Sequence, residues 1–185
     1  MQLSFPHGSS GLLPISPERK SDRMKRIFLT AALMMAASAA PLAAQQTAAD
    51  SVKAVILRTF DGMRAGDSTM VRSALSPAGV TLTSVMVRDG KTVTQSGSMD
   101  DFVRAVGTPH PQVWDERVSD FVVHVDGPLA HAWMNYTFYA GDRLSHCGVN
   151  SIQLMRGDDG WKITAIADTR RNQGCPALPP GSRGE

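Results

Sequence analysis

The sequence is short of the residues that define several specialised classes of protein. It has two cysteines among 185 residues, so it is not a disulfide-dense scaffold, and Gly and Pro together number 27, which excludes a collagen-like repeat. Hydrophobic residues make up 42% of the chain and charged residues 19%, which excludes a chain that is disordered throughout. Length and composition together favour one globular domain.

Three signature motifs are also missing. The sequence has no GxGxxG fingerprint, no P-loop and no HExxH pattern, which excludes the commonest dinucleotide, nucleotide triphosphate and zinc-protease sites. Because these motifs are missing, we expect no cofactor. Their absence does not exclude chemistry that needs no cofactor.

The segment that begins at Met24 predicts a secretory signal peptide. Met24, Lys25 and Arg26 give it a basic start, residues 27–40 carry no charge, and small residues precede Gln45. The apolar run is too short to span a bilayer comfortably, and it is apolar all round, which disfavours the alternative of a core helix. We expect residues 24–44 to be the signal peptide, with cleavage near Ala44 and a periplasmic or secreted protein.

The segments that flank the predicted folded domain differ from it in composition and charge. Residues 1–23 carry three prolines and no periodic apolar pattern, so we expect an over-extended gene start that is disordered if translated. The folded domain is expected over residues 45–176, followed by a flexible tail over residues 177–185. Five of the 19 basic and two of the 17 acidic residues precede residue 45, so the remainder carries a formal charge of −1.

This charge balance limits the partners. No run of five or more Lys and Arg follows residue 44, so we expect no nucleic-acid partner. No cysteine directly follows the apolar run, which excludes a lipid anchor on a mature N-terminal cysteine. We therefore expect no stable membrane anchor after processing.

Apolar residues at three- and four-residue spacing predict helices in the first part of the folded domain. One helix is expected over residues 48–65, ended by Gly66, and Asp67 can cap a short second helix. A third helix is expected between a capping box at Ser98 and a stop at Gly107. The buried face of the first helix is predicted to carry Val52, Val55, Ile56, Phe60 and Met63.

Strand-like runs separated by short Asp and Gly connections dominate the second part of the chain. Such connections indicate hairpins, so the last four runs should pair as an antiparallel meander. Helices followed by strands predict an α+β fold with the helices on one face of the sheet. The predicted strands cover residues 80–88, 91–95, 118–125, 130–140, 144–155 and 161–167.

Several short segments together form a recognisable sequence pattern. The most specific are His-Cys-Gly at residues 146–148 and Asp-Thr-Arg-Arg at residues 168–171 with a later cysteine; the others cover residues 60–67, 132–139 and 159–163. Together they resemble the nuclear transport factor 2-like superfamily, and within it a SnoaL-like group of exported bacterial proteins named for lumazine binding. The resemblance covers about residues 48–175.

This resemblance implies a cone-shaped α+β fold. Three N-terminal helices would pack on a strongly curved antiparallel sheet and leave a pocket at the open end. It implies no particular reaction, because related folds include isomerases, cyclases, dehydratases and proteins that only bind.

Strand alternation selects candidate ligand-binding residues. A period of two places Trp133, Asn135 and Tyr139 on one face of their strand, while His146 and Asn150 share a face of the next. Polar residues at one end of a face and aliphatic residues further along suit a pocket with a polar mouth and an apolar floor. The alternative is packing or a dimer interface for Trp133 and Tyr139, and a structural or exposed role for His146 and Asn150.

Asp168 and His146 are the candidate acid or base residues. Asp168 ends the last predicted strand, and an isomerase of this fold class needs a carboxylate base and an oxyanion donor such as Tyr139 or His146. Arg170 and Arg171 favour the alternative that Asp168 forms a salt bridge or caps a turn. His124 and His131 lie on strands without a matching set of carboxylates, so no metal site is expected.

The two cysteines suit an oxidising compartment. Cys147 lies in a predicted strand and Cys175 in a Gly-Cys-Pro segment, so a disulfide would tie the C-terminus to the sheet. In the chain-entropy model it would stabilise the fold by about 3 to 4 kcal/mol. The alternative, a reactive Cys147 paired with His146, is disfavoured because adjacent strand residues point to opposite faces.

Three functional hypotheses follow. The first is a domain that binds a small, partly apolar ligand and is a homodimer through its sheet. The second is a cofactor-free enzyme of the isomerase, cyclase or dehydratase kind that uses Asp168 or His146. The third is a structural partner of another envelope protein.

Overall fold

The computed structural model describes residues 44–184 of the chain. The predicted extension over residues 1–23 and the predicted signal peptide, except for Ala44, lie outside the described residues. Within residues 44–184, no helix is both long and apolar enough to cross a membrane.

The boundary between the first two helices lies where the local sequence predicts, although the first helix is already helical at residue 44 and not only from residue 48. Residues 44–65 are helical, and Gly66 ends this helix with a φ of 67°, a left-handed conformation that favours glycine. Helix α2 (Ser68–Ala74) follows directly, and the side chain of Asp67 accepts a hydrogen bond from the backbone N–H of Met70. The predicted stop and cap are therefore confirmed.

Helix α3 (Met99–Gly107) is capped in the same way. The Ser98 hydroxyl accepts a hydrogen bond from the backbone N–H of Asp101, and Asp100 and Asp101 place negative charge in the first turn. Val103 and Val106 are buried on its inner face.

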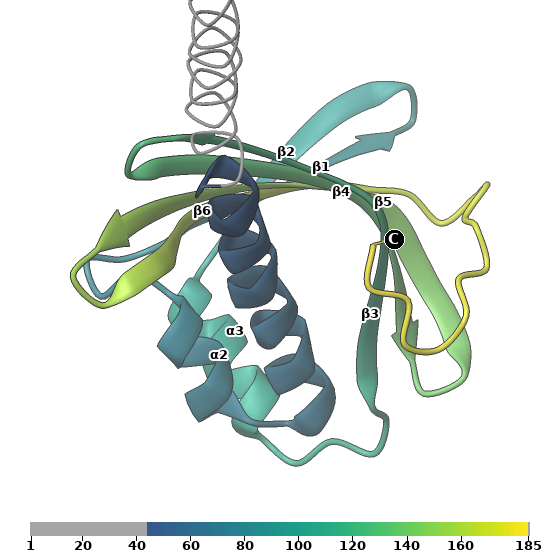
Figure 1. Ribbon diagram of the computed structural model, residues 1–185. Helices are drawn as coiled ribbons and strands as arrows, with labels where there is room; N and C mark the ends of the chain where they lie inside the picture. Colours follow the sequence, from purple (N-terminus) through teal and green to yellow (C-terminus); the bar gives the residue numbers. More distant parts are fainter. Residues whose placement is uncertain (1–43, 185) are drawn as a thin grey trace, which may run out of the picture. The chain divides into compact units, whose positions relative to one another are not determined.

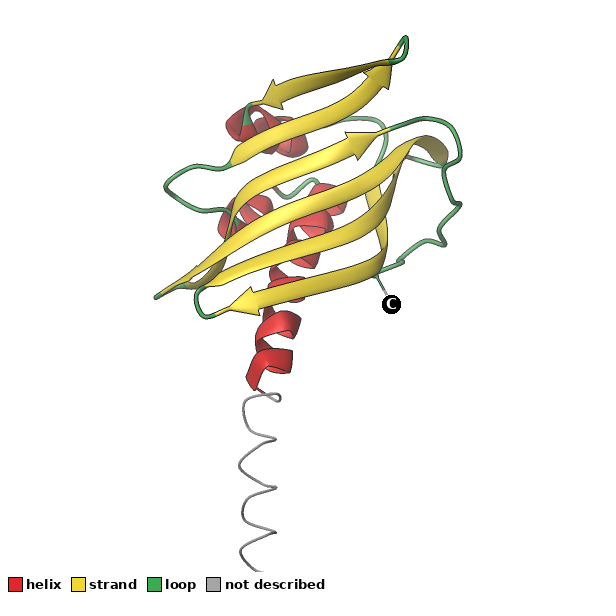
Figure 2. Cartoon of the chain, turned by 90° about the horizontal axis from the view of Figure 1, so that it is seen from above, coloured by secondary structure: helices red, strands yellow, loops and turns green. Residues whose placement is uncertain are grey.

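Six strands form one sheet in the order β2-β1-β6-β5-β4-β3. Figure 1 shows the sheet curving over the helices, and Figure 2 shows the strands side by side with the helices on one face. We call the face toward the helices the inner face and the opposite one the outer face. The strands are β1 (Thr81–Arg88), β2 (Lys91–Gly97), β3 (Trp114–Asp126), β4 (Leu129–Ala140), β5 (Arg143–Gly157) and β6 (Gly160–Arg170).

The meander predicted for the last four strands is confirmed. The sheet differs from the prediction in two other respects. Strand β1 runs parallel to β6, so the sheet is antiparallel at every pair except this one. Strand β3 begins at Trp114 and not at Val118, because its first residues, Trp-Asp-Glu-Arg, lack the apolar alternation by which strands are recognised.

One hydrophobic core joins the helices to the sheet. Val52, Ile56, Phe60 and Met63 of the first helix are buried, while Val55 is partly buried against them, so the predicted helix face is confirmed. On the sheet side, the core contains Ala130, Ala132, Met134, Ile152 and Leu154. These strand residues alternate with exposed ones, such as Trp133 and Met155, on the outer face.

The predicted disulfide between Cys147 and Cys175 is present, with 5.5 Å between the Cα atoms. It anchors a C-terminal segment that continues along the edge of the sheet, where the backbone N–H of Val118 donates to the carbonyl of Ser182. Further bonds join Thr137 to the carbonyl of Pro176, Arg117 to that of Leu178, and Lys53 to that of Gly184. The flexibility expected after residue 177 stays a prediction, but the segment has defined partners.

Candidate functional site

The inner face of the sheet divides into an apolar half and a polar half. In the apolar half, Ala132 and Met134 of β4 lie beside Ile152 and Leu154 of β5 within the core. In the other half the same two strands carry Tyr136, His146 and Asn150, and the neighbouring strands add Ser84, Glu116, Asp168 and Arg170. We call these seven residues the polar cluster.

Asp168 is the centre of the polar cluster. Its side chain is 6% exposed and accepts a hydrogen bond of 2.7 Å from the Ser84 hydroxyl of the neighbouring strand β1. The guanidinium of Arg170 forms an ion pair with it, with 2.7 Å between Nε and Oδ2. Although burial opposes it, this carboxylate raises the pKa of Arg170, so the guanidinium stays charged. The predicted salt bridge of Asp168 is therefore present, with Arg170 as its partner.

Tyr136 reaches the same carboxylate from β4. Its hydroxyl lies 3.1 Å from Oδ2 of Asp168 and 2.9 Å from the carbonyl oxygen of Thr169, so its one proton is shared between two acceptors. Burial and the nearby negative charge of Asp168 raise the pKa of Tyr136, which keeps the hydroxyl protonated.

Gly148 allows strands β5 and β6 to approach closely beside Tyr136. A Cβ atom at this position would lie 1.7 Å from the carbonyl oxygen of Thr169, which no side chain can tolerate without a backbone shift. The Thr169 hydroxyl also accepts a hydrogen bond of 3.0 Å from the backbone N–H of Val149. Glycine at this position thus places the Thr169 carbonyl within reach of the tyrosine hydroxyl.

Glu116 is the second carboxyl of the polar cluster. Its Oε1 accepts a hydrogen bond of 2.6 Å from the side-chain amide of Asn150, whereas Oε2 has no hydrogen-bond partner among residues 44–184. Burial raises the pKa of Glu116 to about 7, and the negative charge of Asp168 acts in the same direction while the Asn150 bond opposes it. Near neutral pH this carboxyl can both give and accept a proton.

His146 is a member of the polar cluster that is partly exposed to solvent. Its ring packs against Phe138, with 5.0 Å between ring centroids, and lies edge-on to Tyr136 at 5.7 Å. Burial and the nearby cation of Arg170 lower its pKa, so the imidazole is neutral at pH 7.

An open groove adjoins the polar cluster through His146 and Arg170. It has a volume of about 920 Å³ and is lined by residues 85–88 of β1, Thr92 and Gln95 of β2, His146, and residues 169–173. We call it the β1–β6 groove. Its size is within the range of sites for small organic molecules.

Comparison with known proteins identifies the architecture. No protein-family model matches the sequence, and no curated protein matches it. A nuclear transport factor 2-like protein of unknown function from Shewanella baltica is 17% identical, over 67% of this chain and 94% of that chain, with a TM-score of 0.52. One from Pseudomonas putida, also of unknown function, is 16% identical over 70% and 90%, with a TM-score of 0.53.

A third structure, a nuclear transport factor 2-like protein with a cystatin-like fold from Novosphingobium aromaticivorans, is 13% identical, over 77% of this chain and 92% of that chain, with a TM-score of 0.54. This chain has the nuclear transport factor 2-like fold. The fold predicted from the sequence is thereby confirmed. At these identities the likeness carries no ligand or reaction to this chain, and the resemblance to the narrower exported group stays a prediction.

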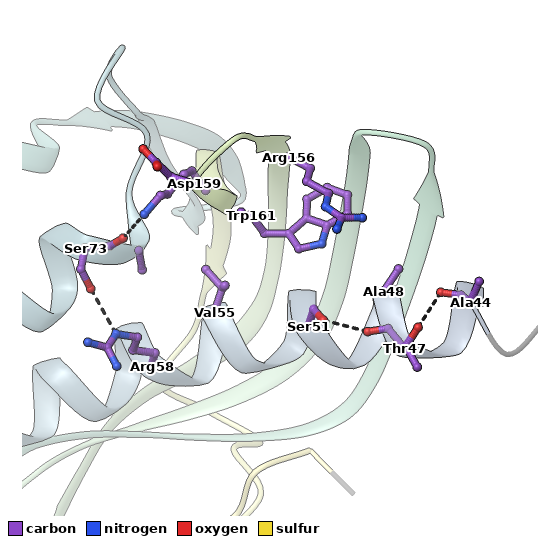
Figure 3. Close-up of a pocket in the computed structure, with 13 residues that line it drawn as sticks. Ala44, Thr47, Ala48, Ser51, Val55, Arg58, Ser73, Arg156, Asp159 and Trp161 are labelled. Atoms are coloured by element: carbon purple, nitrogen blue, oxygen red, sulfur yellow. Dashed lines mark hydrogen bonds between the residues drawn. The ribbon is translucent and has the colours of Figure 1, made fainter.

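A second hollow on the nuclear transport factor 2-like fold lies between the first helix and the β5–β6 turn. It has a volume of about 560 Å³ and includes Arg58, Ser73, Arg156, Trp161 and Lys162. Figure 3 shows Arg58 donating from Nε to the Ser73 hydroxyl, at 3.1 Å. Lys162 donates to the Ser73 carbonyl at 2.6 Å. Basic side chains commonly satisfy the last carbonyls of a helix, so the Lys162 contact has a structural explanation.

The five predicted ligand-binding residues do not form one site. His146 and Asn150 both belong to the polar cluster, together with the predicted acid Asp168. Trp133 is 49% exposed on the outer face, where Asn135 donates a hydrogen bond of 2.7 Å to Asp120. These two residues are separated from the cluster because odd-numbered residues of β4 in this stretch point away from the helices.

Tyr139 has a different environment again. It is buried near the sheet edge, and the Arg117 guanidinium lies 3.8 Å from the centroid of its ring. The β3–β4 pairing runs without a shift from Thr137 to Tyr139, so Tyr139 lies on the face opposite to Glu116 and Phe138 and away from the polar cluster.

Sequence reasoning missed Glu116, Ser84 and Tyr136. Glu116 falls in the part of β3 that the apolar pattern did not reveal, and Ser84 is distant in the sequence but lies opposite Asp168 in the β1–β6 pair. A signal for Tyr136 existed, since a tyrosine on an otherwise apolar face needs a polar partner when it is buried. Among residues 44–184, no group of three or more His, Cys, Asp or Glu is placed to hold a metal ion.

Proposed function

We propose that this protein binds a small, partly apolar molecule in the β1–β6 groove, with the polar cluster at its inner end. The supporting observation is the continuity between the two: His146 and Arg170 line the groove and also contact the buried side chains of Tyr136 and Asp168. A hollow with apolar walls and a few fixed polar groups is the usual form of a small-molecule site. A role outside the cytoplasm is part of the proposal and is supported by the disulfide.

The apolar walls come from β1. Val85, Met86 and Val87 line the groove, and Val87 is 70% exposed, which is unusual for an apolar side chain of this size. Ligand binding would remove this surface from water, which is favourable by about 25 cal/mol per Å² of apolar area.

Titration with the neutral fluorophore N-phenyl-1-naphthylamine tests the proposal. We expect saturable binding, and a Thr92→Trp substitution should weaken it by about tenfold or more because the indole would occupy the groove. Thr94→Trp is the matched control, because Thr94 is an exposed residue of the same strand that does not line the groove. Absence of saturable binding, or equal affinity in all three proteins, would reject the proposal.

Glu116 supports a second candidate function, proton transfer by an isomerase-like or dehydratase-like enzyme. Its Oε2 has no hydrogen-bond partner among the described residues, and its pKa of about 7 suits a general acid or base, whereas the Asp168 carboxylate already accepts bonds from Ser84 and Arg170. The experiment is deuterium incorporation from D₂O into cyclohexanone, followed by NMR. The enzyme hypothesis predicts a rate above that of buffer which Glu116→Gln abolishes, and a rate equal to buffer for the wild type rejects it.

A further inference from the structure

The charged side chains that line the β1–β6 groove are all cationic. Arg88, Arg170 and Arg171 line it, and no Asp or Glu does. The chain from residue 45 onward carries a formal charge of only −1, with acidic and basic residues nearly equal in number. Three arginines without a lining carboxylate are therefore a local feature of the groove and not a consequence of composition.

The register of the sheet brings these arginines together. Strand β1 runs parallel to β6, and Met86 lies opposite Arg170. Arg88 lies two residues after Met86, and Arg171 lies one residue after Arg170. The carboxyl ends of two parallel neighbouring strands meet at the same edge of a sheet. The three arginine positions thus lie at the same edge of the sheet, and all three side chains line the groove.

Most of this positive charge has no acidic partner among residues 44–184. Arg88 and Arg171 form no ion pair with a carboxylate in the part of the chain that the structure describes. Arg170 donates two hydrogen bonds to Asp168, from Nε to Oδ2 at 2.7 Å and from Nη2 to Oδ1 at 3.4 Å. Its Nη1 makes no hydrogen bond to a described residue. Asp168 therefore fixes the orientation of the Arg170 guanidinium, and two arginines without a carboxylate partner among the described residues line the same groove.

We propose that the β1–β6 groove selects organic anions, molecules that carry a carboxylate, sulfonate or phosphate on an apolar scaffold. This inference rests on the proposed binding function and names the class of ligand. Guanidinium groups bind such anions through two parallel hydrogen bonds, and Val85 and Val87 offer apolar surface to the scaffold. His146 offers a neutral imidazole at the inner end.

Two fluorophores that differ by one anionic group provide the test. 1-Anilinonaphthalene-8-sulfonate carries a sulfonate, whereas N-phenyl-1-naphthylamine has the same ring system without it. We expect the double substitution Arg88→Gln with Arg171→Gln to weaken binding of the sulfonate by about tenfold or more and that of the neutral probe by less than about twofold. Added NaCl should weaken binding of the sulfonate probe and leave binding of the neutral probe unchanged.

Arg58→Gln with Arg156→Gln is the matched control, because it removes two cations from the second hollow and leaves the groove intact. It should change the affinity of neither probe by more than about twofold. Equal loss of sulfonate binding in both double variants, or none in the groove variant, would overturn the inference. A groove variant that weakens both probes equally would reject anion selection and leave the binding function standing, whereas no binding of either probe to the wild type would reject both.

Discussion

The two halves of the inner face are built from the same strands but are stabilised in different ways. In the apolar half, Met134, Ile152 and Leu154 are almost fully buried and belong to one hydrophobic core with the helices. In the polar half, buried side chains such as Tyr136, Asn150 and Asp168 are held by hydrogen bonds and an ion pair. The difference shows that the candidate site lies where polar residues replace apolar ones along continuous strands.

Truncation of the apolar half should have the largest effect on stability. Leu154 has no exposed surface, so Leu154→Ala should lower the free energy of unfolding by about 2 to 5 kcal/mol, from lost burial and the cavity that remains. Urea denaturation measures this loss. Below the transition, affinity for N-phenyl-1-naphthylamine should be unchanged, because the groove is lined by other residues.

Met155→Ala is the control for Leu154→Ala on the same strand. Met155 is 56% exposed on the outer face, so its truncation should change stability by less than about 0.5 kcal/mol. Similar losses for both substitutions would contradict the assignment of inner and outer faces.

Gly148→Ala should disturb the polar half through its backbone. The new Cβ would lie 1.7 Å from the Thr169 carbonyl oxygen, so the strands must move apart at a cost of about 1 to 3 kcal/mol. The Tyr136 hydroxyl would lose this acceptor. Denaturation together with the near-ultraviolet circular dichroism of the tyrosine reports both effects.

Gly157→Ala tests whether any glycine of β5 would respond in this way. No atom lies within 4 Å of a Cβ built at Gly157, so its substitution should leave stability unchanged or raise it slightly. Equal stability of the two alanine variants would contradict the close packing of the strands at Gly148.

Glu116→Gln should have the smallest effect, visible in the pH dependence of stability. Because the pKa of Glu116 is raised to about 7 in the folded state, the unfolded chain releases this proton more readily, and wild-type stability falls between about pH 4.5 and pH 7. The glutamine variant lacks this loss. Relative to the wild type it should gain on the order of 1 kcal/mol or more between pH 5 and pH 8, measured by urea denaturation.

Asp142→Asn controls for the removal of one carboxyl from an exposed turn. His146 titrates in an overlapping range, and its lowered pKa acts in the opposite direction, since its stability contribution is lost as the pH falls. This contribution is common to wild type and variant and cancels in their difference. A pH-independent difference for Glu116→Gln would show that its carboxyl is not perturbed.

Local rules and resemblance predicted the fold well because its signals are close in the sequence. Asp67 and Ser98 cap their helices through contacts three residues away, and the short turns specify the meander. The disulfide followed from the small number of cysteines and the expected compartment.

The candidate site was harder to predict because it depends on register across distant strands. His146, Asn150 and Asp168 were chosen, but Ser84 joins them only through the parallel β1–β6 pair, and the sequence does not specify which strands are neighbours. Glu116 was missed because a strand of charged residues shows no apolar alternation.

Chemical-shift mapping of the protein with N-phenyl-1-naphthylamine tests the central claim most directly. If the polar half and its groove form the binding site, the largest amide shifts should fall on residues 85–88, on His146 and on residues 169–173. Largest shifts around Trp133 on the outer face, or around Trp161 in the second hollow, would contradict the account.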